Sequence, residues 1–175
     1  NTVVFDKTGT LTKGEPVVTN VFVVGSVEEK EVLKIAAIAE KGSEHPIGQA
    51  IVKKATEQNP KIPNATSYET ISGKGIKAVY LNKIILVGNR KFLEENRFPL
   101  DELENTLQKL EIEGKTAVIV AHGTKVVGVV AVADILKEFS KETVSELHKM
   151  KKEVVMITGD NERTANYIAK QVGID

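Results

Sequence analysis

The strongest constraint on the fold is a short apolar run, residues 3–5, followed at once by Asp6 and the polar, glycine-containing residues 7–12. Such a run predicts a buried parallel strand. An open α/β sheet presents its reactive groups at the carboxyl ends of its strands, so Asp6 is expected at the mouth of a sheet. Gly9 lets the backbone turn sharply there. The alternative is an ordinary surface turn with Asp6 as a cap.

The residue types after this strand suit phosphoryl transfer. A carboxylate such as Asp6 can attack phosphorus and hold the phosphoryl group as an aspartyl-phosphate. The reaction depends on positioning and on neutralising charge. Thr8, Thr10 and the loop amides can supply hydrogen bonds, and Mg²⁺ would supply most of the positive charge.

A second strand-and-turn motif lies near the end of the chain. Residues 154–157 are apolar, and Thr158, Gly159 and Asp160 follow them. An amphipathic helix comes next, and its N-terminus favours bound anions. If the two strands are parallel neighbours, this turn faces the same crevice as Asp6.

Composition excludes several classes of function. The 175 residues include 24 basic and 24 acidic side chains, which gives no nucleic-acid signal. Cysteine is absent, so the chain has no disulfide or thiolate chemistry. No stretch approaches the roughly 20 apolar residues that a membrane helix needs.

The order of elements predicts an α/β unit interrupted by an inserted α+β domain. Residues 1–14 and 133–175 are assigned to the first unit, and residues 15–132 to the insert. Within the insert we expect an antiparallel sheet flanked by helices that cover one face. A capping box at residues 26–29 predicts a helix to about residue 41, and Pro46 suits the first turn of another. Strands are expected at residues 76–80 and 84–87 around a tight turn at Asn82 and Lys83.

Residues 6–12 resemble the phosphorylation motif of the P-type ATPases, within the haloacid-dehalogenase-like superfamily. The resemblance implies a Rossmann-like phosphorylation domain, here partial, in which Asp6 is the phosphorylated nucleophile and Lys7 belongs to the catalytic motif. Thr8 would bind Mg²⁺ and phosphate together with Asp6. Related phosphatases have a second Asp where Thr8 stands, so slow hydrolysis of a phosphoenzyme is expected.

Residues 43–46, Ser-Glu-His-Pro, resemble a signature of the heavy-metal (type IB) P-type ATPases. In that subclass the element lies in the ATP-binding domain, which would be the insert here. Without the resemblance, His45 would be an ordinary loop residue, and the Gly-x-Gly element at residues 73–75 would be a turn. Asn89 would be the N-cap of a helix over residues 91–95. The positions that match family sites around ATP are Glu40, His45, Gly73, Gly75, Gly88 and Asn89.

The resemblance extends to the remaining motifs. Thr158 would hold phosphate and Asp160 would organise the hinge, with Gly159 between them. Asp134 and Lys137 match a hinge pair that bridges the domains near ATP. The family often has Pro where Ile135 stands.

The resemblance as a whole implies a cytoplasmic piece of an integral membrane ATPase that exports a heavy-metal cation, with Cu⁺ expected. Its partners would be ATP, Mg²⁺, the transported cation, and the actuator and transmembrane domains of the parent chain. The chain stops before the family's last cytoplasmic motif. One rival is a soluble phosphatase of the same superfamily. The other is a nucleotide-binding module without catalysis.

Overall fold

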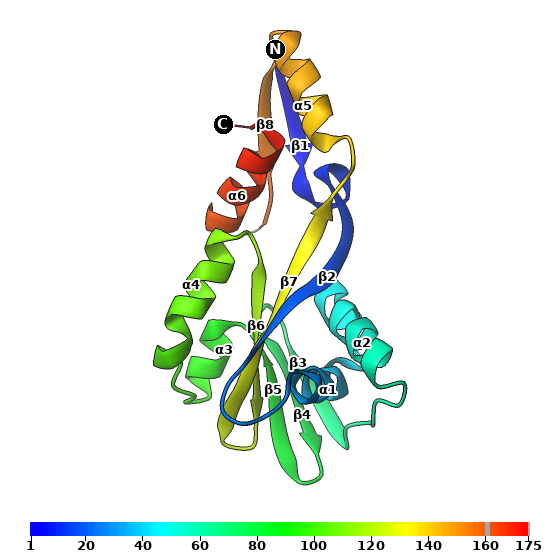
Figure 1. Cartoon of the computed structure of the whole chain (residues 1–175), viewed down its shortest axis with the longest axis vertical. Helices are drawn as coiled ribbons and strands as arrows, with labels where there is room; N and C mark the ends of the chain where they lie inside the picture. The colour runs from blue at the N-terminus through cyan, green and yellow to red at the C-terminus, as the bar shows by residue number, and fades with distance from the viewer. Residues whose placement is uncertain (160–161, 175) are drawn as a thin grey trace.

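A computed structural model describes residues 1–159 and 162–174 of the chain. Asp160 of the second motif therefore lies outside the described residues. The molecule is elongated, with both termini towards one end and a broad sheet at the other (Figure 1). None of the helices in the described part is long and apolar enough to cross a membrane.

Two parallel strands, β1 (Thr2–Asp6) and β8 (Glu153–Ile157), form the smaller sheet, and their pairing aligns Asp6 with Ile157. Helices α5 (Ser140–Lys149) and α6 (Glu162–Val172) pack beside them. The core of this unit contains Leu11, Val144, Val154, Val172 and Ile174. The predicted parallel pairing is confirmed, so the two motif turns leave adjacent strand ends.

The larger sheet has six antiparallel strands in the order β2-β7-β6-β5-β4-β3. Its strands are β2 (Thr12–Val23), β3 (Ser67–Ile71), β4 (Gly75–Tyr80), β5 (Lys83–Gly88), β6 (Thr116–His122) and β7 (Lys125–Leu136). Edge strand β3 has no counterpart among the predicted strands. Four of its five residues are exposed, so it carries no apolar alternation from which to recognise it.

Helices cover both faces of this sheet. Helices α1 (Glu29–Glu40) and α2 (Pro46–Gln58) lie on one face, and α3 (Arg90–Glu95) and α4 (Glu104–Ile112) on the other. The prediction of one covered face is wrong, and β6 shows the reason. Val118 and Val120 belong to the core under α1 and α2, whereas Ile119 and Ala121 belong to the core under α3 and α4. Strands that are apolar at successive positions are buried on both sides.

Local sequence patterns predict some ends of helices and strands correctly and others wrongly. Pro46 is in the first turn of α2, as predicted. The capping box at Ser26 is wrong, because the backbone at Glu28 is still extended (φ −94°, ψ 155°) and α1 begins only at Glu29. The β4–β5 turn lies one residue earlier than predicted, at Leu81 and Asn82, whose φ values are 49° and 60°. Two positive φ angles in a two-residue loop match the twist of a hairpin.

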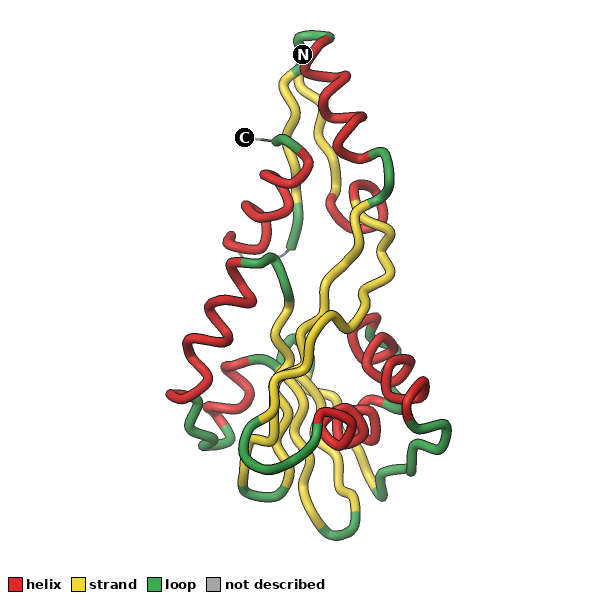
Figure 2. Tube along the Cα trace, in the orientation of Figure 1, coloured by secondary structure: helices red, strands yellow, loops and turns green. Residues whose placement is uncertain are grey.

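Strands β2 and β7 connect the two sheets. They pair from Thr12–Leu136 to Val23–Gly128 and carry the chain from one sheet to the other (Figure 2). The proposed boundaries at residues 14/15 and 132/133 fall inside these continuous strands, so the division into domains stays a prediction.

Candidate functional site

The turn after β1, Lys7–Leu11, has a geometry that requires glycine. Thr8 has φ −75° and ψ 123°, and Gly9 has φ 77° and ψ −10°. These are the central angles of a type II turn, whose second central residue needs a positive φ. Gly9 satisfies that requirement without steric cost. The local sequence thus sets the path of the backbone immediately after Asp6.

The returning end of β7 holds this turn in place. Asp134 Oδ2 lies 2.5 Å from the Thr12 hydroxyl, and Asp134 Oδ1 accepts a hydrogen bond from the Gly14 amide at 3.1 Å. Beyond β7, the Lys137 ammonium donates to the Gly9 carbonyl at 2.6 Å. The Ser140 hydroxyl donates to the Leu11 carbonyl at 2.6 Å. The predicted hinge pair, Asp134 and Lys137, therefore supports the Asp6 loop directly.

The second motif lies beside the first. Thr158 and Gly159 follow β8, one residue beyond the pair Asp6–Ile157. Asp6 is exposed and Thr158 is half-buried. Two predicted catalytic segments, about 150 residues apart in sequence, thus meet at one sheet edge.

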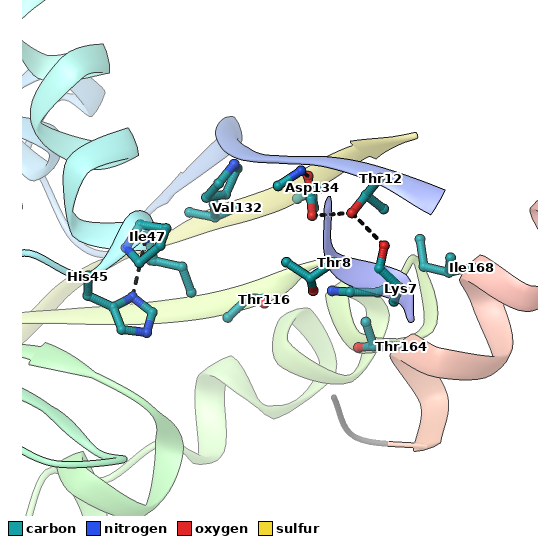
Figure 3. Close-up of a pocket in the computed structure, with 15 residues that line it drawn as sticks. Lys7, Thr8, Thr12, His45, Ile47, Thr116, Val132, Asp134, Thr164 and Ile168 are labelled. Carbon is teal, nitrogen blue, oxygen red and sulfur yellow. Dashed lines mark hydrogen bonds between the residues drawn. The ribbon is translucent and has the colours of Figure 1, made fainter. Parts of the chain in front are cut away.

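A cavity of about 300 Å³, here the loop cavity, opens next to this edge (Figure 3). Lys7, Thr8 and Asp134 line it, whereas Asp6, Lys137 and Thr158 do not. Helix α6 contributes Thr164 and Ile168 to the wall. In Figure 3, Thr8 lies between Lys7 and Thr116. The cavity brings polar groups of the Asp6 loop to face the start of β6.

A second cavity of about 470 Å³, here the sheet cavity, lies between the α1–α2 turn and strands β4, β5 and β6. Its volume is in the range usual for small-molecule sites. Its walls include the apolar Ile71, Ile76, Val87 and Val118. All six residues predicted to surround ATP line it: Glu40, His45, Gly73, Gly75, Gly88 and Asn89. The fold therefore gathers every one of these positions, which come from three separate stretches of the chain.

The glycines of this cavity differ in what they allow. Gly75 and Gly88 face each other across β4 and β5. A Cβ at Gly75 would lie 2.2 Å from the Val87 carbonyl, and one at Gly88 would lie 2.5 Å from the Lys74 carbonyl. Gly73, in contrast, has φ +71° and open space where a Cβ would be. Gly75 and Gly88 are thus required by the sheet itself, whatever else they do.

Asn89 fastens residues 73–75, here the glycine loop, to α3. Its Oδ1 accepts from the Phe92 amide at 3.0 Å, so the predicted N-cap is confirmed. Its Nδ2 donates to the Gly73 carbonyl at 2.9 Å. One side chain thereby fixes both the helix start and the position of the loop at the cavity.

Glu40 is a buried carboxylate, 8% exposed, at the end of α1. Burial raises the pKa of Glu40, while a hydrogen bond from Ser43 and the charge of His45 act in the opposite direction. A Cβ at Gly48 would lie 2.3 Å from Glu40 Oε2. The carboxylate is thus held between the α1–α2 turn and the first turn of α2, at the cavity wall.

His45 is the N-cap of α2. Its Nδ1 accepts a hydrogen bond from the Ile47 amide at 3.2 Å. In the neutral ring this bond assigns the proton to Nε2, which is then a donor. The exposed ring lines both cavities. The loop reading of His45 and a ligand-facing role are therefore compatible.

Several cavity residues have no clear signal in the sequence. Thr116, Ala117 and Val118 reach the sheet cavity only because β6 pairs with β5, with Ile119 opposite Gly88. Ser43 could have been inferred from its place beside His45 in the Ser-Glu-His-Pro element. Thr12 belongs to the Asp6 motif, but its contact with Asp134 depends on the returning strand.

The described residues contain no cluster of three or more His, Asp or Glu side chains placed to hold a metal ion. The Asp6 carboxylate and the Thr8 hydroxyl are hard oxygen donors on one turn. Mg²⁺ is commonly held by one or two carboxylates, with the rest of its shell from phosphates and water. This donor set suits Mg²⁺ arriving with a phosphorylated ligand.

Known proteins resemble the chain over its whole length. Residues 1–175 match the haloacid dehalogenase-like hydrolase family. A copper-exporting P-type ATPase of Staphylococcus saprophyticus is 44% identical over 175 residues, all of this chain and 21% of the relative. A probable copper-exporting P-type ATPase of Archaeoglobus fulgidus is 48% identical over 174 residues, 99% of this chain and 21% of the relative. The chain thus spans about a fifth of the length of these curated relatives.

Solved structures of PIB-type ATPases also resemble this chain. The structure of a zinc-transporting PIB-type ATPase in the E2.Pi state matches it with a TM-score of 0.81 and 36% sequence identity, over 99% of this chain and 28% of that chain. The catalytic domain of the CPx-ATPase CopB-B, solved in a study of nucleotide binding, has a TM-score of 0.71 and 28% identity, over 99% of this chain and 60% of that chain. The N-domain of HMA8, a copper-transporting P-type ATPase, has a TM-score of 0.56 and 34% identity, over 67% and 99%.

Proposed function

The chain belongs to the haloacid dehalogenase-like hydrolases and corresponds to the catalytic region of PIB-type ATPases, and from this we propose that it binds ATP and accepts its γ-phosphoryl group on Asp6. The parent protein would be an integral membrane, copper-exporting P-type ATPase, with this chain as part of its cytoplasmic region. The transported cation, the actuator domain and the transmembrane domain would belong to the parts of the parent protein beyond this chain.

One observation carries the proposal. The six residues selected for ATP from the sequence alone line a single cavity of about 470 Å³. The apolar walls suit a purine base, and the glycine loop suits close approach of a ligand to backbone.

In the proposed complex the adenine lies in the sheet cavity between Val118 and the glycine loop. Glu40 accepts a hydrogen bond from the exocyclic amino group, and the His45 ring packs on the base or donates from Nε2. The phosphates extend towards the loop cavity, where Lys7 and Thr8 face them. Closure between the two sheets then brings the γ-phosphate to Asp6.

The transfer itself forms one bond and breaks another. The Asp6 carboxylate attacks the γ-phosphorus, the bond between γ-phosphorus and the bridging β-oxygen breaks, and ADP leaves with the electron pair. Asp6 and Thr8 would hold Mg²⁺, which supplies charge neutralisation when bound. Thr158 and Gly159 donate to the phosphoryl oxygens from the neighbouring strand end. Thr8 has no carboxylate with which to activate water, so the phosphoenzyme persists long enough to drive transport.

Nucleotide binding is tested with His45→Asn. Asparagine keeps an N-cap acceptor for α2 but removes the ring. Loss of a base contact of about 1–3 kcal/mol predicts about a 5- to 150-fold weaker ATP affinity by calorimetry. His148→Asn, on α5 and away from both cavities, is the matched control. Wild-type protein that fails to bind ATP would refute the proposed function.

Phosphorylation is tested in the longer protein that contains this chain. Incubation with γ-labelled ATP should give an acid-stable label, and Asp6→Asn should abolish it without loss of ATP binding. Asn is isosteric, and Asp6 is exposed, so the fold should be unaffected. Labelling that survives in Asp6→Asn would show that another residue is the nucleophile.

A further inference from the structure

The two cavities share three lining residues: His45, Ile47 and Thr116. His45 and Ile47 come from the start of α2, and Thr116 is the first residue of β6. A ligand with one end in the sheet cavity and the other in the loop cavity must pass these three side chains. Figure 3 shows Thr116 between His45 and Thr8.

Of the three, Thr116 offers an uncommitted hydroxyl. Ile47 is apolar, and His45 Nδ1 already accepts from the Ile47 amide. Within residues 1–159 and 162–174, the Thr116 side chain makes no hydrogen bond, although it is exposed at the cavity rim. A hydroxyl can rotate to donate to whichever acceptor is placed before it.

The neighbouring lysine is a weaker candidate for the same place. The Lys115 ammonium lies 2.7 Å from Glu113 Oε2 and 2.9 Å from Asn20 Oδ1. It lines neither cavity. Lys115 precedes β6, whereas Thr116 is the first residue of the strand. The strand therefore presents the hydroxyl, not the ammonium, to the passage.

The register of β6 explains why Thr116 is at the passage. Thr116 pairs with Val132 of β7, and two residues later β7 reaches Asp134, which lines the loop cavity. In the other direction, Ala117 and Val118 line the sheet cavity. Within β6, Thr116 is thus the residue that lines both the sheet cavity and the loop cavity.

We propose that the Thr116 hydroxyl binds the triphosphate chain of the nucleotide where it crosses from the sheet cavity to the loop cavity. This inference rests on the proposed function, because it assumes ATP with its base in the sheet cavity. The hydroxyl donates to a charged phosphate oxygen and so aligns the chain towards Lys7 and Thr8. Thr116 is a ligand-binding residue for phosphate and makes no contact with the base.

The test compares ATP with adenosine. Thr116→Val keeps the shape and β-branching of threonine but removes the hydroxyl, and Thr116→Ser keeps the hydroxyl. Loss of a hydrogen bond to a charged group predicts about a tenfold loss of ATP affinity in Thr116→Val. Adenosine affinity should be unchanged, and Thr116→Ser should bind ATP as the wild type does. Thr19→Val, on the exposed part of β2 outside both cavities, is the control.

Two results would overturn the inference while leaving the proposed function intact. One is wild-type ATP affinity in Thr116→Val. The other is an equal loss for ATP and adenosine, which would indicate a distorted base site. A wild-type protein that binds neither ligand would instead refute the proposed function itself, and this inference with it.

Discussion

A negative charge at the tip of the glycine loop should separate nucleotide binding from folding. Gly73 lines the sheet cavity, has φ +71°, and has no atom within 4 Å of where a Cβ would be. Gly123, in the β6–β7 turn, has φ +65° and equally open space, but lines neither cavity. Gly73→Asp and Gly123→Asp are therefore matched in backbone strain and differ in their distance from the ligand.

The cost in stability should be the same for both variants. A non-glycine residue at such φ values costs about 1 kcal/mol, somewhat less for Asp. For a chain of this size that lowers Tm by about 2–4 °C.

The effect on ATP affinity should differ between the two variants. A charge roughly 5 Å from a phosphate oxygen repels it by about 0.8 kcal/mol in water and about 3.3 kcal/mol at an effective dielectric of about 20. Gly73→Asp should then lose about 4- to 300-fold in ATP affinity, and Gly123→Asp none.

Two further measurements separate charge from size. Gly73→Asn adds a neutral side chain of the same shape and should retain most ATP affinity. Raising the ionic strength should reduce the difference in ATP affinity between Gly73→Asp and the wild type, because salt screens exposed charges. Equal ATP affinity in Gly73→Asp and Gly123→Asp, by calorimetry at low salt, would refute the location of the phosphates. Gly75 is unsuitable for this test, since any side chain there would collide with the Val87 carbonyl.

Two predictions concern pH. Because burial raises the pKa of Glu40, its contribution to stability is complete below the usual value of 4.5 and is lost as pH rises through the raised pKa. Glu40→Gln should therefore have a higher Tm than the wild type at pH 7, and this difference in Tm should disappear near pH 4. The control Glu69→Gln, at an exposed position, should have the wild-type Tm at both pH values. For His122, burial and the nearby charge of Lys83 lower the pKa, and Glu31 opposes them. Wild-type Tm should fall more steeply than that of His122→Gln below pH 6.5, and parallel curves would contradict this.

The parts of the site that could be predicted from the sequence are those with local signals. Gly9 and the strand before Asp6 can be recognised within a few residues, and so can Pro46 and the Asn89 N-cap. The positions expected around ATP follow from a family resemblance, and the structure brings them together at one cavity. Whether each contacts the nucleotide stays a prediction, especially for Asn89, whose amide already binds Gly73 and Phe92.

The parts that could not be predicted depend on pairing between distant segments. Thr116 reaches both cavities only through the strand order β7-β6-β5, which no local pattern specifies. The two-sided burial of the larger sheet has the same origin, because α3 and α4 find their face only once β5 and β6 are paired. Edge strand β3 is polar, so its position is set by β4 and not by its own sequence.

The loop after Asp6 is held by groups that come from much later in the chain. Three of the groups that fix the loop, on Asp134, Lys137 and Ser140, come from more than 115 residues later in the chain. They arrive in register because β2 and β7 pair over most of their length before β7 reaches the loop. The pairing of β2 with β7 thus links the two sheets and brings Asp134, Lys137 and Ser140 to the residues that follow Asp6.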